Sequence, residues 1–277
     1  MLTTATSELL LPGYRVDPES GAWVTLPWPD DPDEKAALVS MSLGPALIDW
    51  AEGRGMDGHG DPVPGLTHYQ TCLPWRYTPG QKRFIILWWL LDSDGRFVYR
   101  RGVKRGAKGT GKDPFGGALM DTELCGPVEL YDWDDRTGRP IGRRRGMPLV
   151  QVSSNSEAQS KDILRVANAL WGAEAKEFYG IDAGDTRTVI KDTGGRLEVN
   201  VASEASSEGD PVTAGFLNET HHMRTPEARR VAAVARRNAA KSPSHIQARV
   251  LELTNAHGLG GGSVAEASME TWQKQLG

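Results

Sequence analysis

One short stretch of this sequence combines the residue types that hold phosphate groups. It has the spacing G-x-x-x-x-G-K and reads Gly106-Ala107-Lys108-Gly109-Thr110-Gly111-Lys112. Glycine allows the backbone to curl so that its N–H groups point toward phosphate oxygens, and lysine adds a positive charge. We therefore predict a phosphate-binding loop, for which the alternative is a basic surface turn.

The surroundings of this loop favour the phosphate interpretation. A strand is predicted before the loop and a helix after it, so the N-terminal end of the helix would direct its dipole at a bound anion. The approach to the loop is also strongly basic. Between positions 96 and 112 there are seven basic residues and no acidic one, namely Arg96, Arg100, Arg101, Lys104, Arg105, Lys108 and Lys112.

A second segment offers the oxygen ligands that phosphate chemistry needs. The apolar run from Val212 to Leu217 predicts a strand, and it ends in Asn218-Glu219-Thr220-His221-His222. A site that transfers a phosphoryl group to water needs one carboxylate to orient that water and oxygen ligands to hold Mg²⁺. Glu219 stands where the first of these is expected, whereas Asn218 offers magnesium only a neutral amide oxygen.

Two positions depart from the usual pattern of such sites. After Lys112 a serine or threonine normally follows, with its hydroxyl on Mg²⁺, but this sequence has Asp113. Asn218 likewise stands where an aspartate is usual. We hypothesise that Asp113 supplies the carboxylate that Asn218 lacks, which makes Asp113, Asn218 and Glu219 the predicted magnesium ligands.

The histidine pair His221-His222 is not expected to form a separate metal site. Neighbouring histidines on a strand or a helix point apart, and we find no cysteine or carboxylate cluster with ligand spacing beside them. The two cysteines of the chain, Cys72 and Cys125, do not make a disulfide framework either. They indicate a reducing compartment such as the cytoplasm.

The predicted elements alternate between strand and helix. Strands are expected at 96–104, 147–153, 186–191, 197–202, 212–217 and at the end of 245–254, and helices at 33–52, 114–124, 156–171 and 225–241. Ser154 or Asn155 would cap the third of these helices, and Thr225 the fourth with Pro226 at its first position. The alternation favours an α/β fold with a mostly parallel sheet between helix layers, after an irregular N-terminal segment.

Composition excludes several classes of protein. The apolar and charged fractions, 39% and 25%, are those of an ordinary globular chain. The longest apolar run, from Phe84 to Leu91, is too short to span a bilayer and predicts a buried strand or helix. No secretion signal is visible. A net charge of −4 argues against nucleic-acid binding over the whole surface.

The motifs resemble, in order, those of the large terminase subunits of tailed double-stranded DNA phages, in their ATPase portion. The similar segments are 75–81, 100–115, 150–159 and 218–222, followed by 253–256 and 260–266. The resemblance implies a P-loop NTPase fold that takes ATP and Mg²⁺. It implies that Gln81 contacts adenine and that Thr254 and Asn255, in a coupling motif, sense the γ-phosphate. It further implies an arginine lent to a neighbouring subunit, for which the candidates are Arg101, Arg105, Arg229, Arg230, Arg236 and Arg237.

The resemblance also implies a place in virus assembly. We expect an N-terminal segment at 1–75 and an ATPase domain at 76–277, with the family's nuclease domain absent, so that this chain alone would not cleave DNA. Expected partners are double-stranded DNA, the portal protein, the small terminase subunit and further copies in a ring, in the host cytoplasm and without a membrane. DNA would be held through its phosphates, with 136–145 as a candidate contact.

Two other functions stay open at this point. Asp113 and Asn218 could mark a nucleotide-binding assembly subunit with impaired hydrolysis. A helicase-like nucleic-acid ATPase would share the glycine loop and Glu219, although the order of the motifs and the Thr254-Asn255 segment weigh against it.

Overall fold

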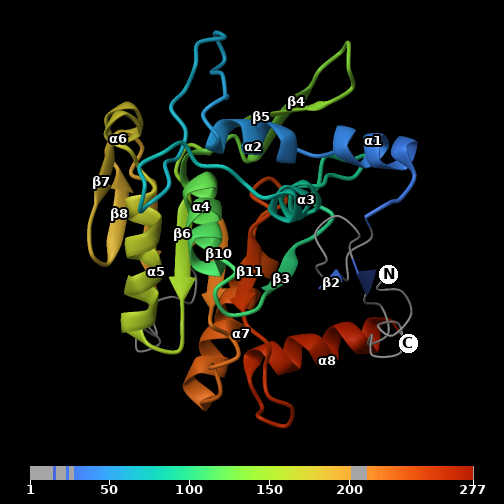
Figure 1. The fold of residues 1–277 in the computed structure, drawn as a ribbon, viewed down its shortest axis with the longest axis vertical. Helices are drawn as coiled ribbons and strands as arrows, with labels where there is room; N and C mark the ends of the chain where they lie inside the picture. The colour runs from blue at the N-terminus through green and yellow to red at the C-terminus, as the bar shows by residue number, and fades with distance from the viewer. Residues whose placement is uncertain (1–14, 17–22, 25–27, 201–210, 277) are drawn as a thin grey trace, which may run out of the picture.

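The centre of the molecule is a mostly parallel β-sheet. A computed structural model describes residues 15–16, 23–24, 28–200 and 211–276. Within them, seven strands form one sheet in the order β3-β11-β10-β6-β9-β8-β7 (Figure 1). The strands are β3 (Arg101–Arg105), β6 (Leu149–Ser153), β7 (Ile181–Ala183), β8 (Arg187–Ile190), β9 (Arg196–Val199), β10 (Ala214–Asn218) and β11 (Arg249–Thr254). From β3 to β9 neighbouring strands are parallel, while β8 and β7 join antiparallel.

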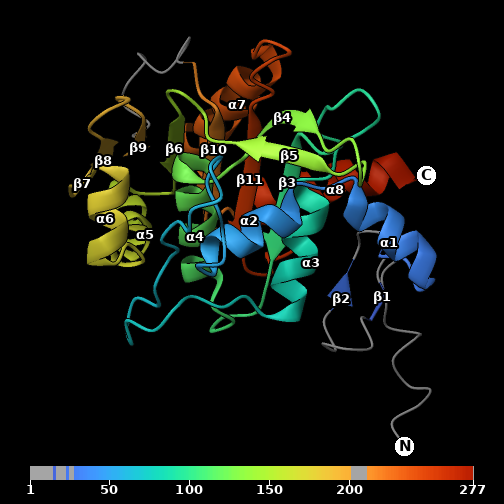
Figure 2. The ribbon, with the colours of Figure 1, turned by 90° about the horizontal axis from the view of Figure 1, so that it is seen from above.

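Helices cover both faces of this sheet, as Figure 2 shows from above. The helices of the described residues are α1 (Pro32–Ser40), α2 (Gly44–Ala51), α3 (Pro79–Trp88), α4 (Lys112–Cys125), α5 (Glu157–Ala169), α6 (Ala173–Tyr179), α7 (Pro226–Lys241) and α8 (Val264–Leu276), of which α1 lies beside the sheet rather than on it. Two short antiparallel pairs lie outside the main sheet, β1 (Arg15–Val16) with β2 (Trp23–Val24) and β4 (Glu129–Trp133) with β5 (Pro140–Arg143). In the part of the chain that the structure describes, no helix is both long and apolar enough to cross a membrane.

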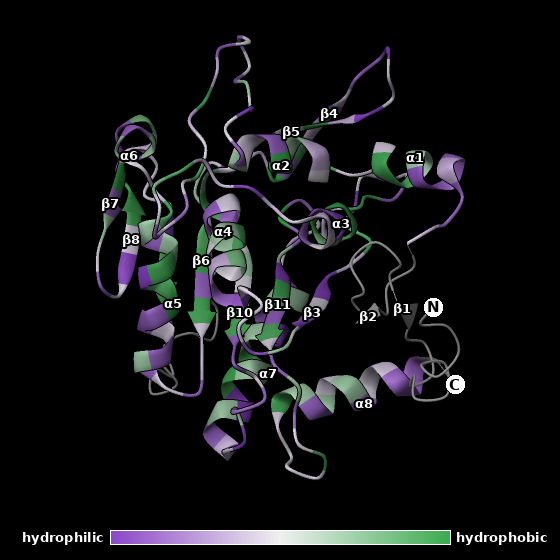
Figure 3. Cartoon of the chain, viewed as in Figure 1, coloured by the Kyte–Doolittle hydropathy of each residue, from purple (hydrophilic) through white to green (hydrophobic). Residues whose placement is uncertain are grey.

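The central strands are buried on both faces because each face packs against helices. Every residue of β6, β10 and β11 is buried, and Figure 3 shows apolar stretches along these strands. Successive side chains of a strand point to opposite faces. Phe216 accordingly joins a core cluster that contains residues of α4 and α5, whereas Leu217 joins a second cluster with residues of α7. This is the burial expected of a parallel sheet between helix layers.

Several predicted elements are confirmed. Thr225 caps α7 by accepting a hydrogen bond from the Ala228 amide, and Pro226 is the first helical residue. The strands expected at 186–191 and 197–202 correspond to β8 and β9, which pair as an antiparallel hairpin. The apolar run that begins at Phe84 lies mainly in helix α3. The positions predicted as strand at 201–202 fall outside the described residues.

Other expectations were wrong in detail. The helix expected at 33–52 is interrupted at Met41–Leu43, where Ser42 binds the α3 carbonyl of Ile86 through its hydroxyl instead of continuing the helix. Helix α5 is capped by Ser156, whose side chain accepts from the Gln159 amide, and not by Ser154 or Asn155. Strand β3 begins at Arg101, since the preceding residues form a turn and an isolated bridge. Helices α6 and α8 and strands β4, β5 and β7 had not been predicted.

The segment before Trp75 shares its core with the sheet domain. Leu47 and Trp50 of α2 belong to the same buried cluster as Trp88 of α3 and Phe115 of α4. Helices α2 and α3 approach so closely at Gly44 that a Cβ there would lie 2.6 Å from the Ile86 Cα. The region from α2 onward is thus packed as a continuous body with the sheet.

A buried ion pair joins the start of β11 to the last turn of α4. Arg249 begins β11 and is 1% exposed, and its Nη2 lies 2.8 Å from the Glu123 carboxylate. The guanidinium stacks on the rings of Trp88, Trp89 and Phe97 at 3.9 to 4.9 Å from their centroids. Burial lowers the pKa of Arg249 to about 10, and the Glu123 charge opposes that shift. The arginine stays charged at neutral pH.

Removing this arginine should destabilise the fold strongly. Arg249→Met leaves the Glu123 carboxylate buried without its partner, and we expect the free energy of unfolding to fall by about 3–5 kcal/mol in urea denaturation. The control is Arg165→Met, which breaks an ion pair to Asp162 that is 81% and 71% exposed; it should change stability by no more than about 0.5 kcal/mol. Equal effects of the two substitutions would contradict the assignment.

Candidate functional site

The glycine loop lies between β3 and α4, as predicted. Its first residue, Gly106, donates its N–H to the carbonyl of Thr254 at 3.0 Å, which fixes the loop to the end of β11. Gly109 and Gly111 have φ angles of 83° and 73°, a backbone conformation that side chains disfavour. Gly111 is the N-cap of α4, and no side chain caps this helix. The N-terminus of α4 is therefore suited to an anion.

Lys112 holds two carboxylates at the start of α4. Its side chain is 8% exposed, and its Nζ donates to Asp113 Oδ1 at 2.5 Å and to a carboxylate oxygen of Glu219. Burial alone would lower the pKa of Lys112, but the hydrogen bonds that its ammonium donates to the two carboxylates outweigh this effect and raise that pKa. A permanent positive charge thus lies between the glycine loop and the end of β10.

Glu219 reaches this position through an unusual backbone turn. It follows the last residue of β10 and has a φ of 56°, in the left-handed region. Such a conformation costs a non-glycine residue of order 1–3 kcal/mol and is concentrated at functional sites. The Glu219 N–H is fixed by the Leu253 carbonyl at 2.8 Å. The turn directs the carboxylate at Lys112, which is where a water-orienting group would be needed.

The same turn brings the two histidines together. Their ring centroids lie 3.9 Å apart, and Glu219 Oε2 is 3.3 Å from His221 Nε2 and 3.8 Å from His222 Nε2. The expectation that the two rings point apart, with no cluster of ligands beside them, was wrong, because residues 219–222 form a turn rather than a strand or helix. The three donor atoms lie within 4.8 Å of one another and could hold a metal ion. Burial lowers the pKa of His221, so the ring is neutral at pH 7.

Asn218 provides a buried side-chain oxygen beside Glu219. The residue is 4% exposed, and its Oδ1 has no hydrogen-bond partner among the described residues. Buried polar atoms are rarely left unsatisfied, so this oxygen fits a ligand that binds beside Glu219. Asp113, 50% exposed, contacts the same lysine as Glu219. Asp113, Asn218 and Glu219 are hard oxygen donors, as Mg²⁺ requires.

The predicted phosphate-sensing pair lies at the end of β11, next to this turn. Thr254 is fully buried, and its hydroxyl accepts from the His221 N–H at 3.1 Å. The Asn255 N–H lies 3.4 Å from His221 Nδ1, and the Asn255 Oδ1 is buried without a partner among the described residues. The structure thus places Thr254 and Asn255 against the histidine rather than separate from it.

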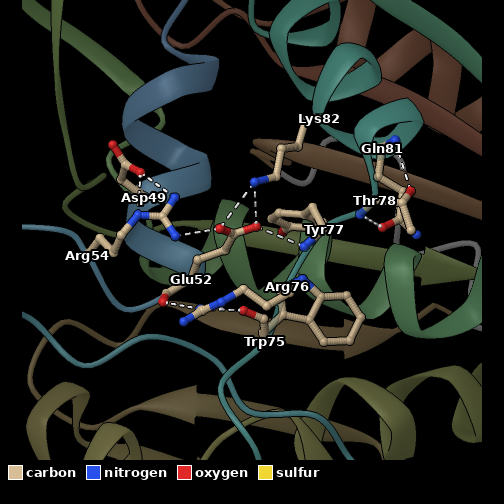
Figure 4. A network of polar contacts seen from close by, with 9 residues as sticks. All are labelled: Asp49, Glu52, Arg54, Trp75, Arg76, Tyr77, Thr78, Gln81 and Lys82. Carbon is tan, nitrogen blue, oxygen red and sulfur yellow. Dashed lines mark hydrogen bonds and ion pairs between the residues drawn. The ribbon is translucent and has the colours of Figure 1, made fainter. Parts of the chain in front are cut away.

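Gln81, the predicted adenine contact, lies in a polar network at the start of α3 (Figure 4). It forms a capping box with Thr78, in which Gln81 Oε1 accepts from the Thr78 N–H at 2.9 Å. Beside it, the buried Glu52 accepts from Arg54, Lys82 and the Tyr77 N–H. Burial raises the pKa of Glu52, but hydrogen bonds from the Tyr77 amide, Arg54 and Lys82 outweigh burial. The pKa is lowered overall, so the carboxylate is charged.

Glu52, which accepts several of the hydrogen bonds in this network, was not among the residues predicted from sequence. It holds the segment 75–82 against the end of α2, and Arg76 adds hydrogen bonds to the Glu52 and Trp75 carbonyls. Nothing in the local sequence pairs Glu52 with residues 25 to 30 positions away. The signal that could have identified it is its type and place: a glutamate directly after the mostly apolar helix α2.

The candidate trans-acting arginines have different surroundings. Arg101 and Arg105 are exposed on β3, the edge strand of the sheet. Burial lowers the pKa of Arg101, with a smaller contribution from the nearby Arg236 charge. Arg236 is bound to Glu252 at 2.6 Å and to Ser268 at 2.9 Å, so it ties α7 to β11 and α8. The remaining candidates, Arg229, Arg230 and Arg237, are exposed on α7.

The basic residues of the candidate DNA contact at 136–145 form a cluster on the β4–β5 hairpin and directly after it. Arg143 pairs with Glu129 at 3.2 Å and lies over Tyr131. Arg144 stacks on Tyr179 at 4.9 Å, and Arg145 is buried. Much of the cluster therefore serves packing within the chain. Its contact with DNA stays a prediction.

Comparison with known proteins identifies the fold. No family model matches the chain. It is similar to the Gene 13 protein of Mycobacterium phage L5, with 31% identity over 251 residues, and to that of Mycobacterium phage D29, with 35% identity over 202 residues. Its structure is similar to the large terminase of bacteriophage HK97, with a TM-score of 0.58 and 14% identity over 85% of the chain. The chain has a large-terminase fold.

This likeness confirms the predicted terminase-like α/β fold. The chain spans 38% and 33% of the two Gene 13 proteins and 42% of the HK97 large terminase. The segments matched in sequence cover 88% and 71% of this chain.

The two departures from the usual site pattern predict a compensating pair of substitutions. Asp113→Ser should abolish the predicted magnesium-dependent ATP hydrolysis, because it removes the carboxylate that stands in for the one that Asn218 lacks and leaves Glu219 as the only charged ligand among the three. Adding Asn218→Asp should restore hydrolysis by returning one carboxylate to the site. ATP turnover at varied Mg²⁺ concentration measures both. An inactive double variant that still folds and binds ATP would refute the exchange.

Proposed function

We propose that this chain is the ATP-hydrolysing motor part of a phage large terminase, which moves double-stranded DNA into the procapsid. The observation that carries the proposal is the meeting of Lys112 and Glu219. Lys112 belongs to a glycine loop at an uncapped helix N-terminus, and Glu219 directly follows β10. A large-terminase fold provides the context for this pair.

The loop residues would bind the phosphate chain of ATP. The backbone N–H groups at the start of α4 and the Lys112 ammonium favour negative charge at the same place. In the structure the Lys112 ammonium forms ion pairs with Glu219 and Asp113. Phosphate oxygens would replace the Glu219 contact, so that nucleotide binding and release of the glutamate are one event.

The freed Glu219 carboxylate would then orient a water molecule for attack. ATP supplies the electrophilic γ-phosphorus when bound, and Mg²⁺ neutralises charge on its oxygens. Asn218 Oδ1, Asp113 and Glu219 would hold the metal. Because little covalent chemistry is required of the protein in phosphoryl transfer, positioning and electrostatics by these side chains carry the rate.

The wider assembly follows from the terminase proposal. Copies of the chain would form a ring on the portal protein, with the small terminase subunit as a further partner, in the host cytoplasm. Arg101 and Arg105, exposed on the edge strand β3, are candidates to reach a neighbouring copy's phosphates. DNA would be bound through its phosphates, and the binding would weaken with salt and ignore sequence.

One observation favours a second candidate, a nucleotide-binding assembly subunit without efficient hydrolysis. Asn218 offers Mg²⁺ only a neutral ligand. Asp113 forms an ion pair with Lys112, so its carboxylate is already engaged in this structure. A chain of this kind would bind nucleotide and change shape without turnover.

ATP turnover separates the two candidates. With Mg²⁺ and double-stranded DNA, we expect Glu219→Ala to lower kcat by on the order of a hundredfold or more, since it removes the group that positions the water. Nucleotide binding should persist, because the loop and Lys112 are intact. Glu177→Ala, an exposed glutamate on α6, serves as the control with unchanged turnover. Equally low turnover in all three proteins would favour the assembly subunit.

A further inference from the structure

We propose that His221 is a positioning residue that joins the Glu219 carboxylate to the Thr254-Asn255 segment, so that the orientation of the glutamate depends on the conformation at the end of β11. The inference rests on the proposed function and adds a route by which that site is regulated. It is carried by the contacts of a buried imidazole and requires no bound metal.

The first half of the connection is the contact between His221 and the end of β11. The His221 N–H donates to Thr254 Oγ1 at 3.1 Å, and ring Nδ1 lies 3.2 Å from the same oxygen. The Asn255 N–H donates to Nδ1 at 3.4 Å. Backbone and ring of one residue are therefore both bound to the predicted phosphate-sensing pair.

The second half is the contact between His221 and the glutamate. Ring Nε2 lies 3.3 Å from Glu219 Oε2, while the other carboxylate oxygen is bound by Lys112. The imidazole side chain is 10% exposed and the carboxylate 18%, so water competes little for this contact. The Glu219 carboxylate thus contacts Lys112 of the glycine loop with one oxygen and His221 with the other, and His221 is in turn bound to the end of β11.

Two contacts of the ring nitrogens favour one tautomer. The Asn255 N–H can only donate, so Nδ1 must accept. The Glu219 carboxylate, 3.3 Å from Nε2, can only accept, which favours hydrogen on Nε2. The tautomer with hydrogen on Nε2 suits the Asn255 N–H and the Glu219 carboxylate. It also argues against a metal on Nε2 in this state, although the three donor atoms of Glu219, His221 and His222 are close together.

This geometry gives His221 a specific task when nucleotide binds. If phosphate draws Lys112 away from Glu219, the His221 contact is what keeps the carboxylate oriented. A shift of Thr254 or Asn255 would move the ring and with it the glutamate. Since a displacement of about 1 Å can cost on the order of a hundredfold in rate, a small movement of β11 is enough to switch hydrolysis.

Two amide substitutions separate the two halves of the connection. In His221→Gln the side-chain amide nitrogen reaches the place of Nε2 and can still donate to Glu219. In His221→Asn it reaches only the place of Nδ1, so the contact with Glu219 is lost. We expect His221→Asn to lower kcat about tenfold or more, with ATP affinity changed by no more than about twofold, and His221→Gln to retain most of kcat. His245→Asn, an exposed histidine before β11, is the control.

A double-mutant cycle with Thr254→Val tests transmission from β11. Valine keeps the shape of threonine and removes the hydroxyl that contacts His221. If the threonine acts through the histidine, Thr254→Val and His221→Asn together should lower kcat no more than His221→Asn alone. Additive losses, or equal effects of His221→Asn and His221→Gln, would overturn the proposal.

Nitrogen NMR of the histidine rings tests the inference without turnover. In the nucleotide-free chain labelled with ¹⁵N-histidine, the His221 signal, assigned through His221→Gln, should show hydrogen on Nε2, and Thr254→Val should shift it. Hydrogen on Nδ1, or no response to Thr254→Val, would overturn the inference. A wild-type chain that turns over no ATP but shows these signals would contradict only the proposed function.

Discussion

A buried ammonium group must have anionic partners, and in this molecule that requirement shapes the whole candidate site. Lys112 is almost completely covered, so without Asp113 and Glu219 its charge would carry a large desolvation cost. The two carboxylates meet that need in the absence of a phosphate, and a phosphate could meet it in their place. The glycine loop, the strained turn at Glu219 and the start of α4 all serve to bring these charges to one point.

The order of the strands explains how distant residues reach that point. Strands β3, β11 and β10 are adjacent and parallel, so the segments that follow them emerge at the same edge of the sheet. The glycine loop follows β3, Thr254 ends β11 and Glu219 follows β10. Ligands bind at the carboxyl ends of strands in open α/β sheets for this reason. At the other end of β11, the Arg249–Glu123 pair fixes the strand against α4.

Much of the fold could be predicted from sequence because its signals are local. Alternating strands and helices, Thr225-Pro226 at a helix start and the glycine loop between strand and helix each depend on neighbouring residues. The break between α1 and α2 could not be seen, since Ser42 is held by a carbonyl of α3 that lies 44 residues away. The grouping of His221, His222 and Glu219 was also missed. A left-handed φ at a glutamate is not encoded in residue type, and it is fixed by the Leu253 carbonyl of the neighbouring strand.

We propose that the Glu219 carboxylate pairs with the Lys112 ammonium until a phosphate group takes its place. The affinity for ATP without magnesium tests this most directly, because no metal ligand is then involved. Glu219→Gln keeps the shape of the side chain but removes the charge that competes for Lys112. Binding measured by calorimetry should be several-fold tighter in Glu219→Gln than in the wild-type chain, with each tenfold equal to about 1.4 kcal/mol. Equal or weaker binding by the variant would contradict the account.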